Sequence, residues 1–307
     1  MDGATGFHAG ELAVQQRAGT RGEAQRLAGM LDEPDLRGGV GHFLAERTLA
    51  GLVARDTAGR LWISPLTGAP GFLDATGATT LRVHSVPGPG DPLRGLPVGQ
   101  PVGLLAIEFA RRRRVRANGT LAAVGPSGLT VEVEQAYGNC PQYIQQRVLD
   151  AVPAAAPEYP GEPVAVARDA LDPDDMALVA AADTFLLGTT HPERGNDASH
   201  RGGSPGFVRV AGPHRLWWPD YPGNNMFNSF GNLEVDPTAA LVFVDFATGR
   251  TLHLSGTARV EWSATGPGDD GGTGRRVWFE VEAVVAGSAD GLRADAVEPY
   301  RRNPALT

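Results

Sequence analysis

The sequence predicts a mainly β protein, built as two small β-barrels with short helices, and three observations support this. Short apolar segments alternate with glycine- and proline-rich turns along most of the 307 residues, which is typical of antiparallel strands. Long crossover helices, which a parallel sheet needs, are missing from the pattern. Two stretches recur: GRLWISPLTGAPGF (59–72) resembles GNDASHRGGSPGF (195–207), and EFARRRRVRANGT (108–120) resembles DFATGRTLHLSGT (245–257). We therefore expect two tandem units that form a pseudo-dimer within one chain.

The spacing of the repeat is regular. Ser64 and Ser199 lie 135 positions apart, and so do the Pro-Gly-Phe triplets at 70–72 and 205–207. Residues 108–120 match residues 245–257 with a constant shift of 137 positions and no gap. Because hairpin and turn residues are shared, we expect the strands of the two units to follow one another in matching order.

The first half of the chain divides into an arm and a first barrel. Residues 1–38 form an N-terminal arm that is helix-prone but interrupted by Gly19 and Gly22. The first barrel, 39–150, begins with a short helix over 39–47. The stretch 87–101 is expected to be a loop because it is rich in glycine and proline. Strands are predicted over 49–55, 61–64, 80–84, 102–109, 115–124 and 129–137.

The second half begins with a Pro/Ala-rich connector at 151–163, which is expected to be extended and semi-rigid. The second barrel, 164–307, opens with a helix that Asp172 can cap, that Pro173 begins and that ends near Ala182. A short helix is predicted over 225–233 and a hairpin turn at 247–250. Strands are predicted over 184–189, 207–210, 215–218, 239–246, 250–262 and 275–285.

Composition limits the function classes. The net charge of −8 argues against a general nucleic-acid partner, and no apolar run approaches the roughly 18–20 residues of a membrane span. The N-terminus lacks the pattern of a secretory signal, and the single cysteine, Cys140, excludes an internal disulfide, so we expect a cytoplasmic protein. All 27 basic residues are arginine, which excludes lysine Schiff-base chemistry. His191, His200 and His253 lack metal-ligand spacing, so no metal site is expected.

Two segments of the second half suit a bound anion. In SHRGGSPGF (199–207), glycines let backbone amides approach a ligand, and Arg201 offers a planar guanidinium to phosphate. The alternative is a glycine-rich turn with a solvated arginine. In DYPGNNMFN (220–228), a loop leads to a helix N-terminus, which is a ready anion site. Here the alternative is a capped surface helix.

Three features of the first half have two interpretations each. The run Arg111–Arg114 is typical of a solvated hairpin, although alternation places Arg114, Arg116 and Asn118 on one face of a strand. Cys140 is either a reactive thiol or a buried structural cysteine. The segment FHAGE (7–11) either places a histidine and a carboxylate in a pocket or begins a helix.

These motifs together resemble the flavin-nucleotide-binding proteins related to pyridoxamine-5′-phosphate oxidase. The matching stretches are SHRGGSPGFVRV (199–210), PDYPGNNMFNSFGNLEVDP (219–237), LVFVDFATGRTLHLSGTARVEW (241–262) and NCPQYIQQR (139–147). FHAGELAVQQRAG and GLLAIEFARRRRVRANG are similar to segments of larger members. The resemblance implies tandem split barrels that pair across a large interface and bind FMN there.

The resemblance also implies cofactor contacts. On the phosphate and ribityl side, the contacts would come from five residues of the second barrel: Ser199, Arg201, Gly203, Asn225 and Asn228. Ser255 and Gly256 of the same barrel would lie along the flavin edge. The first barrel would close the site with Asn139, Tyr143 and Gln145. The oxidase uses lysine with arginine at the phosphate, and this chain has no lysine. Related barrels use a deazaflavin or haem, which stay alternatives to FMN.

The function we expect is an FMN-dependent oxidoreductase that acts on a small organic substrate, with His200 as a candidate proton donor or acceptor. A separate reductase or a nicotinamide donor would supply electrons. The alternatives are a non-catalytic flavin-binding, storage or sensor protein and a fold without a ligand.

The two copies differ where the ligand is expected. Pro65 and Leu66 stand in the first copy where the second has His200 and Arg201. We therefore expect one competent site per chain, in a molecule that is a monomeric pseudo-dimer or a homodimer.

Overall fold

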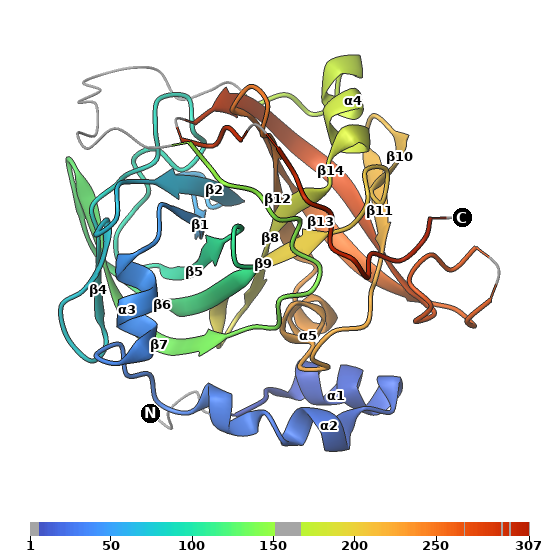
Figure 1. Ribbon diagram of the computed structural model, residues 1–307, viewed down its shortest axis with the longest axis horizontal. Helices are drawn as coiled ribbons and strands as arrows, with labels where there is room; N and C mark the ends of the chain where they lie inside the picture. Colours follow the sequence, from blue (N-terminus) through green and yellow to red (C-terminus); the bar gives the residue numbers. More distant parts are fainter. Residues whose placement is uncertain (1–5, 151–166, 267, 290, 295, 307) are drawn as a thin grey trace.

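Two seven-stranded antiparallel sheets, one from each half of the chain, form the body of the molecule (Figure 1). The computed structural model describes residues 6–150, 167–266, 268–289, 291–294 and 296–306. Helices are few and short. The prediction of a mainly β chain with two tandem units is confirmed, while the predicted connector at 151–163 lies outside the described residues.

The N-terminal arm consists of α1 (Ala9–Ala18), α2 (Arg21–Gln25) and the 3-10 helix η1 (Ala28–Leu31). The arm lies beneath the second unit in Figure 1, against α5 (Asn228–Val235). Helix α1 ends at Gly19, which has a φ of +71° and is the break that the sequence predicts. Gly22 lies inside α2 instead of interrupting it, because its φ is not in the left-handed region.

The first unit begins with α3 (Gly39–Ala45) and continues with one sheet in the order β2-β1-β5-β6-β7-β4-β3. Six of these strands match predicted ones, while the short β3 was not predicted. The strands are β1 (Leu49–Arg55), β2 (Leu61–Thr67), β3 (Leu73–Ala75), β4 (Thr80–Val83), β5 (Pro101–Glu108), β6 (Arg113–Gly125) and β7 (Gly128–Gly138).

The second unit begins with α4 (Pro173–Ala181), where Asp172 and Asp175 form the predicted N-terminal cap. Its sheet has the order β10-β11-β14-β13-β12-β8-β9. Read from the other edge, this is the order of the first sheet. The strands are β8 (Thr184–His191), β9 (Gly195–Gly202), β10 (Arg209–Gly212), β11 (Arg215–Pro219), β12 (Thr238–Asp245), β13 (Arg250–Trp262) and β14 (Arg275–Ser288).

Two differences from the prediction concern the edge strands β2 and β9. Strand β2 continues through Pro65 to Thr67, because an edge strand tolerates a residue that cannot donate to the ladder. Strand β9 was expected to be part of a glycine-rich turn. It pairs with β8 along its whole length. Polar residues lie on both of its faces, so the strand lacks the alternation of apolar and polar residues that predicts a strand.

The repeated glycines have the same structural role in both units. Strand β6 has a bulge at Asn118 and Gly119, and β13 has one at Ser255 and Gly256. A side chain at Gly119 would collide with the carbonyl oxygen of Glu132, and one at Gly256 would collide with that of Glu280. Only glycine therefore fits these bulges, which explains why the NGT and SGT segments match.

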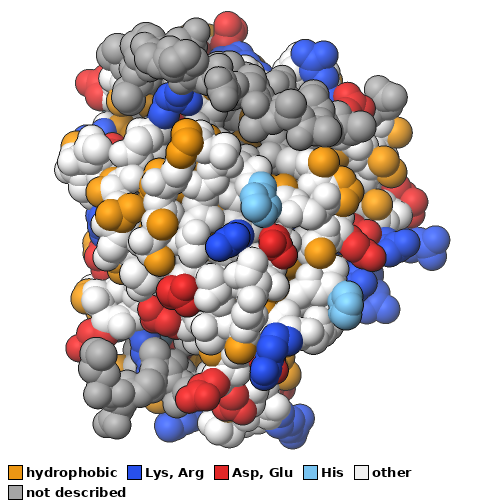
Figure 2. All heavy atoms as spheres, turned by 90° about the vertical axis from the view of Figure 1, so that its left-hand side faces the viewer, with side chains coloured by type: hydrophobic (Ala, Val, Ile, Leu, Met, Phe, Trp, Pro, Cys, Tyr) orange, Lys and Arg blue, Asp and Glu red, His pale blue; other side chains and the backbone are white. Residues whose placement is uncertain are grey.

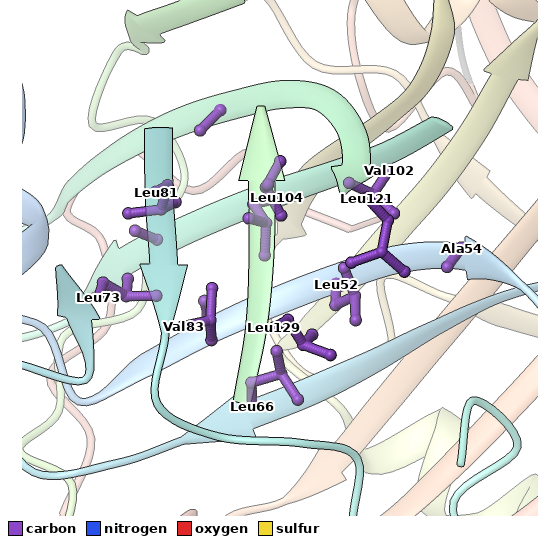
Figure 3. Close-up of a cluster of buried hydrophobic side chains, with 14 of the residues drawn as sticks. Leu52, Ala54, Leu66, Leu73, Leu81, Val83, Val102, Leu104, Leu121 and Leu129 are labelled. Carbon is purple, nitrogen blue, oxygen red and sulfur yellow. The ribbon is translucent and has the colours of Figure 1, made fainter. Parts of the chain in front are cut away.

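Each unit has its own hydrophobic core, and a third cluster joins the two. Figure 3 shows part of the first core, where labelled leucine and valine side chains from several strands pack against one another. The outward face of this unit carries charges of both signs with scattered hydrophobic groups (Figure 2). The joining cluster contains Val53, Leu61, Ile63 and Leu105 of the first unit and Leu186, Ala198, Ala240 and Val242 of the second. A seam between two packed sheets is thus available for a composite site.

Candidate functional site

A cavity lies at the seam, walled by β6 and the segment after β7 from the first unit and by β9, β11 and the start of α5 from the second. Water molecules can reach about 110 Å³ of its interior, which is room for several of them. Residues 219–227 form its outer wall. The lining residues used below are Arg114, Arg116, Asn139, Cys140, Tyr143, His200, Arg201, Trp218, Asp220, Tyr221, Asn225, Phe227, Asn228, Ser229, Phe230 and Arg275.

One face of β6 provides a row of polar contacts to β9 across the seam. Arg114 Nη1 lies 3.0 Å from His200 Nδ1, and Arg116 Nη2 donates to Ser199 Oγ at 2.6 Å. Arg116 also forms an ion pair with Asp197 at 3.0 Å. Alternation on β6 predicted this shared face, and the prediction is confirmed. Arg111 and Arg113, in contrast, are exposed.

Two arginines at the cavity carry charge that no carboxylate pairs with in the described part of the chain. Arg114 donates to His200, to the carbonyl of Gln142 and to Cys140 Sγ, and Arg201 donates to the carbonyl of His200. Burial lowers the pKa of Arg114 to about 10 and also lowers that of Arg201. The cost of these half-buried charges would fall if an anion bound beside them.

His200 is neutral in this setting. Burial and three neighbouring guanidinium groups hold its pKa well below the ordinary value of 6.5. Because Arg114 Nη1 has only protons to donate, Nδ1 of His200 is the acceptor and the ring proton sits on Nε2. That Nε2 atom has no partner among the described residues. His200 therefore suits hydrogen-bond donation better than the proton exchange that the sequence suggested.

The start of α5 opens onto the same cavity. Phe227 at its N-cap has a φ of +58° and makes no side-chain cap, and Asn225 two residues earlier has a φ of +60°. The first backbone amides of the helix belong to Asn228, Ser229 and Phe230, which line the cavity. An uncapped helix N-terminus is electropositive and attracts anions. The helix begins three residues later than predicted because left-handed residues cannot continue it.

Unpartnered polar atoms gather around this cavity. Buried side-chain atoms without a partner occur on six of its lining residues, and each of these atoms can donate a hydrogen bond. They are Arg114 Nε, Arg116 Nε, Asn139 Nδ2, His200 Nε2, Trp218 Nε1 and Tyr221 Oη. Buried donors are normally satisfied, so their concentration at one place indicates a site for an acceptor-rich ligand.

Aromatic residues surround the outer wall. The rings of Tyr143 and Tyr221 lie 5.0 Å apart edge to face, and Tyr300 contacts Tyr143 at 5.5 Å. Tyr143 Oη donates to the carbonyl oxygen of Pro222 at 2.8 Å, which ties the segment after β7 to the outer loop. This wall joins the two units on the solvent side of the arginines.

The structure brings six of the predicted site residues together at the cavity: Asn139, Tyr143, His200, Arg201, Asn225 and Asn228. Ser199 lies one layer behind, bonded to Ser229 Oγ at 2.8 Å and to Arg116. Gln145 is buried and bonds the carbonyl of Tyr143 and the side chain of Asn303. These two residues support the wall without lining it.

Three predicted contacts have other roles in the structure. Gly203 leaves room for the ring of Phe207, which a side chain there would meet at 2.7 Å. Gly68 leaves the same room for Phe72 in the first unit. Ser255 and Gly256 form the β13 bulge and are not among the lining residues. The glycines and serine that suggested ligand contacts are explained here by packing and backbone geometry.

Sequence reasoning gave too little weight to several residues. Arg114 and Arg116 were more easily explained as part of a solvated hairpin, although their alternation was the available signal. Arg275, which pairs with Asp220 at 2.8 Å, had no signal of its own. Cys140 is half-buried in the cavity wall, 3.9 Å from Arg114 Nη2, and is neither fully buried nor fully exposed.

The corresponding place in the first copy is occupied by side chains. Ser64 matches Ser199 by the repeat, and its Oγ donates to Asp91 at 2.6 Å. His253 matches Arg116, and its Nδ1 bonds the carbonyl oxygen of Ile63 at 2.9 Å. Leu93 is fully buried beside Asp91. Around Ser64 a histidine thus stands where the site around Ser199 has Arg116, and Ser64 bonds a carboxylate where Ser199 bonds an arginine.

Two kinds of feature are absent from the described residues: a cluster of metal-binding side chains and a membrane-spanning helix. No group of three or more His, Cys, Asp and Glu residues is arranged to hold a metal ion in the described ranges. Among the same residues, no helix is long and apolar enough to cross a membrane.

No protein-family model matches the chain, and no curated protein sequence matches it either. Solved structures do match. HupZ of Group A Streptococcus is 13% identical, with 41% of this chain and 99% of that one covered and a TM-score of 0.32. A candidate pyridoxamine 5′-phosphate oxidase of Lactobacillus delbrueckii is 16% identical (38% and 93% covered, TM-score 0.30). HutZ, the heme storage protein of Vibrio cholerae, is 14% identical (39% and 96% covered, TM-score 0.28). The proteins to which this chain is similar thus include oxidase-like and heme-storage proteins, and each match covers nearly all of that protein but only about two fifths of this chain.

Proposed function

We propose that this chain binds one phosphate-bearing aromatic cofactor, FMN in the first place, at the seam cavity and serves as an oxidoreductase for a small organic substrate. The observation that carries the proposal is the pair of half-buried arginines, Arg114 and Arg201, which form no ion pair with a carboxylate among the described residues and stand beside unpartnered donors. An anionic group with several acceptor oxygens satisfies both the charge and the donors.

The donor set fits the phosphate end of such a cofactor. Guanidinium groups, amides and the open N-terminus of α5 are the groups that hold phosphate where lysine is absent. The interior of about 110 Å³ suits a phosphate and part of a ribityl chain. A flat ring system would then lie at the aromatic wall of Tyr143 and Tyr221, with residues 219–224 displaced outward.

The bound flavin would supply hydride-transfer chemistry. The side chains of the protein would fix its position and control its surroundings. His200 Nε2 would donate a hydrogen bond to an acceptor in the cavity and, because its pKa is lowered, would stay neutral. Arg114 would hold the His200 tautomer through Nδ1. The aromatic wall would limit access of water to the ring.

The test begins with the absorbance spectrum of the purified protein and titration of ligand-free protein with FMN, riboflavin, a deazaflavin and haem. We expect FMN to bind at one equivalent per chain and riboflavin, which lacks the phosphate, to bind more weakly. Arg114→Gln or Arg201→Gln should weaken FMN binding roughly 10- to 100-fold, as the loss of a charged hydrogen bond predicts.

Arg113→Gln is the matched control. Arg113 lies beside Arg114 on β6 but is exposed, so its loss should leave affinity within about twofold of wild type. The proposal fails if riboflavin binds as tightly as FMN, or if the Arg113 variant is weakened as much as the Arg114 variant.

A second candidate is a non-catalytic flavin-binding protein. The lowered pKa of His200 favours it, because a histidine that stays neutral in the cavity is poorly suited to exchange protons with a substrate. A yellow protein whose flavin is reduced by neither NADH nor NADPH, and reacts with no added substrate, would support this candidate over the oxidoreductase.

A further inference from the structure

The N-terminal motif FHAGELAVQQRAG has no part in the cavity wall, yet its residues hold the segment that forms that wall. Figure 1 shows α1 lying against α5 on the side away from the sheets, with α2 next to α1. Residues 225–232, which we call the anchor turn, contain both left-handed residues and the open start of α5. The arm contacts this turn from its outer side.

The two helices cross at a pair of glycines. A side chain at Gly10 would collide with the carbonyl oxygen of Gly231. A side chain at Gly231 would meet the backbone nitrogen of Glu11 at 2.6 Å. The two backbones are therefore in direct contact here, and a larger residue at either position must push them apart.

Polar groups of the arm bond the anchor turn along its length. Gln15 Nε2 donates to the carbonyl oxygen of Met226 at 3.1 Å, between the two left-handed residues. The other three pairs join Glu23 to Asn225 Nδ2 at 2.5 Å, Glu11 to Asn228 Nδ2 at 2.5 Å, and His8 Nε2 to Asn232 Oδ1 at 3.1 Å.

Asn228 connects the arm to the cavity. Its amide nitrogen donates to Glu11, while its amide oxygen accepts from Arg116 Nη1 at 3.2 Å. Asn228 also lines the cavity. A displacement of α1 would therefore move a cavity residue and release a contact of Arg116.

We infer that the arm, residues 7–31, is a positioning element of the ligand site, which holds the anchor turn in its strained form so that the start of α5 faces the bound anion. Left-handed conformations of asparagine and phenylalanine cost free energy and persist where surrounding contacts fix them. The arm provides those contacts. The inference rests on the proposed function for its ligand, and it adds that arm docking and ligand affinity are coupled.

The test compares Gly10→Ala with Gly22→Ala. The first substitution separates α1 from α5, while the second adds a methyl group where no atom lies within 4 Å. We expect Gly10→Ala to weaken FMN binding roughly tenfold or more, within the usual range of coupling between sites, and Gly22→Ala to leave it unchanged. FMN should also slow tryptic cleavage after Arg21 and Arg26 in the wild-type arm.

A second measurement needs no ligand. Hydrogen exchange of the 225–232 amides should be faster in Gly10→Ala than in wild type or Gly22→Ala. If Gly10→Ala does not fold, Glu23→Ala serves as the milder variant, and Glu23→Gln, which keeps an acceptor for Asn225, should restore wild-type behaviour.

The outcomes separate this inference from the proposed function. If wild type binds FMN and Gly10→Ala binds it equally well with unchanged exchange, the arm is a separate structural appendage and the inference is wrong. If wild type binds none of the tested cofactors, the proposed function fails. In that case, hydrogen exchange of the 225–232 amides in wild type and Gly10→Ala still decides whether the arm fixes the anchor turn.

Discussion

Buried ionisable side chains at the seam are held by individual contacts that set their protonation state. Burial and then Arg114 keep His200 neutral, Arg116 is paired with Asp197, and Asn228 lies between Arg116 and Glu11. Glu11 is the carboxylate that the arm contributes to this network. Burial raises its pKa from 4.5 to about 7, although hydrogen bonds from the His8 backbone and Asn228 oppose the shift.

This shift predicts how stability depends on pH. The folded state keeps the proton of Glu11 between about pH 4.5 and 7, where the unfolded chain has lost it. The free energy of unfolding should therefore fall with rising pH in wild type, relative to Glu11→Gln, and level off above pH 7. Asp197 and Arg194 are the charged groups that affect Glu11, and His8 stays neutral because burial and His191 lower its pKa to about 4.

Urea denaturation of both proteins at pH 5 and pH 8 measures this. From pH 5 to pH 8, the free energy of unfolding of Glu11→Gln should rise by about 2–3 kcal/mol relative to that of wild type. Parallel stability curves for the two proteins would show that Glu11 does not titrate in this range.

At the scale of single elements, bulges and glycines shape the long strands β6 and β13. Both strands are 13 residues long and both shift register at a glycine in the same position of the repeat. The bulge changes which residues face the seam. On β6 it follows the row Arg114, Arg116 and Asn118, which contacts β9.

Gly256→Ala should therefore be strongly destabilising, by about 3 kcal/mol or more, because the added methyl group meets the carbonyl of Glu280. Gly77→Ala is the control, since its added atom lies 3.8 Å from Thr80 in ordinary contact. Thermal denaturation with circular dichroism measures both. Equal midpoints for the two variants would contradict the assigned role of the bulge.

At the scale of the whole molecule, the two units fit each other through unequal residues at equivalent positions. Gly51 matches Leu186 by the repeat spacing, and Val53 matches Gly188. An added side chain at Gly51 would meet Leu186 Cδ1 at 2.7 Å, and one at Gly188 would meet the methyl groups of Val53 at 2.9 Å. A large residue from one unit thus fills the space left by a small one in the other, so neither surface is complementary to itself.

Exchange of one such pair tests this fit. Gly51→Leu overpacks the seam and Leu186→Gly leaves a cavity, and each alone should cost about 3 kcal/mol or more. The double variant should recover a large part of the lost stability, because the leucine side chain introduced at position 51 fills the space that Leu186→Gly leaves. Additive losses in a double-mutant cycle would mean that the two positions do not contact.

The sequence by itself determined the features that depend on local pattern. Period-two alternation placed Arg114, Arg116 and Asn118 on one face, turn residues defined most strands, and the repeated hairpin and turn residues predicted the matching strand order of the two units. Each of these follows from the chemistry of a few neighbouring residues. The sequence also brought six later cavity residues into the set of candidates.

Only the tertiary structure decided which candidates form the site and what state they are in. The contact between Glu11 and Asn228 joins residues 217 positions apart, and the missing carboxylate partner of Arg201 depends on everything packed around it. Strand β9 was not recognised because its polar side chains are satisfied by β6 of the other unit. Burial, charge pairing and pKa shifts are sums over distant neighbours, and they exist only once the two sheets and the arm have come together.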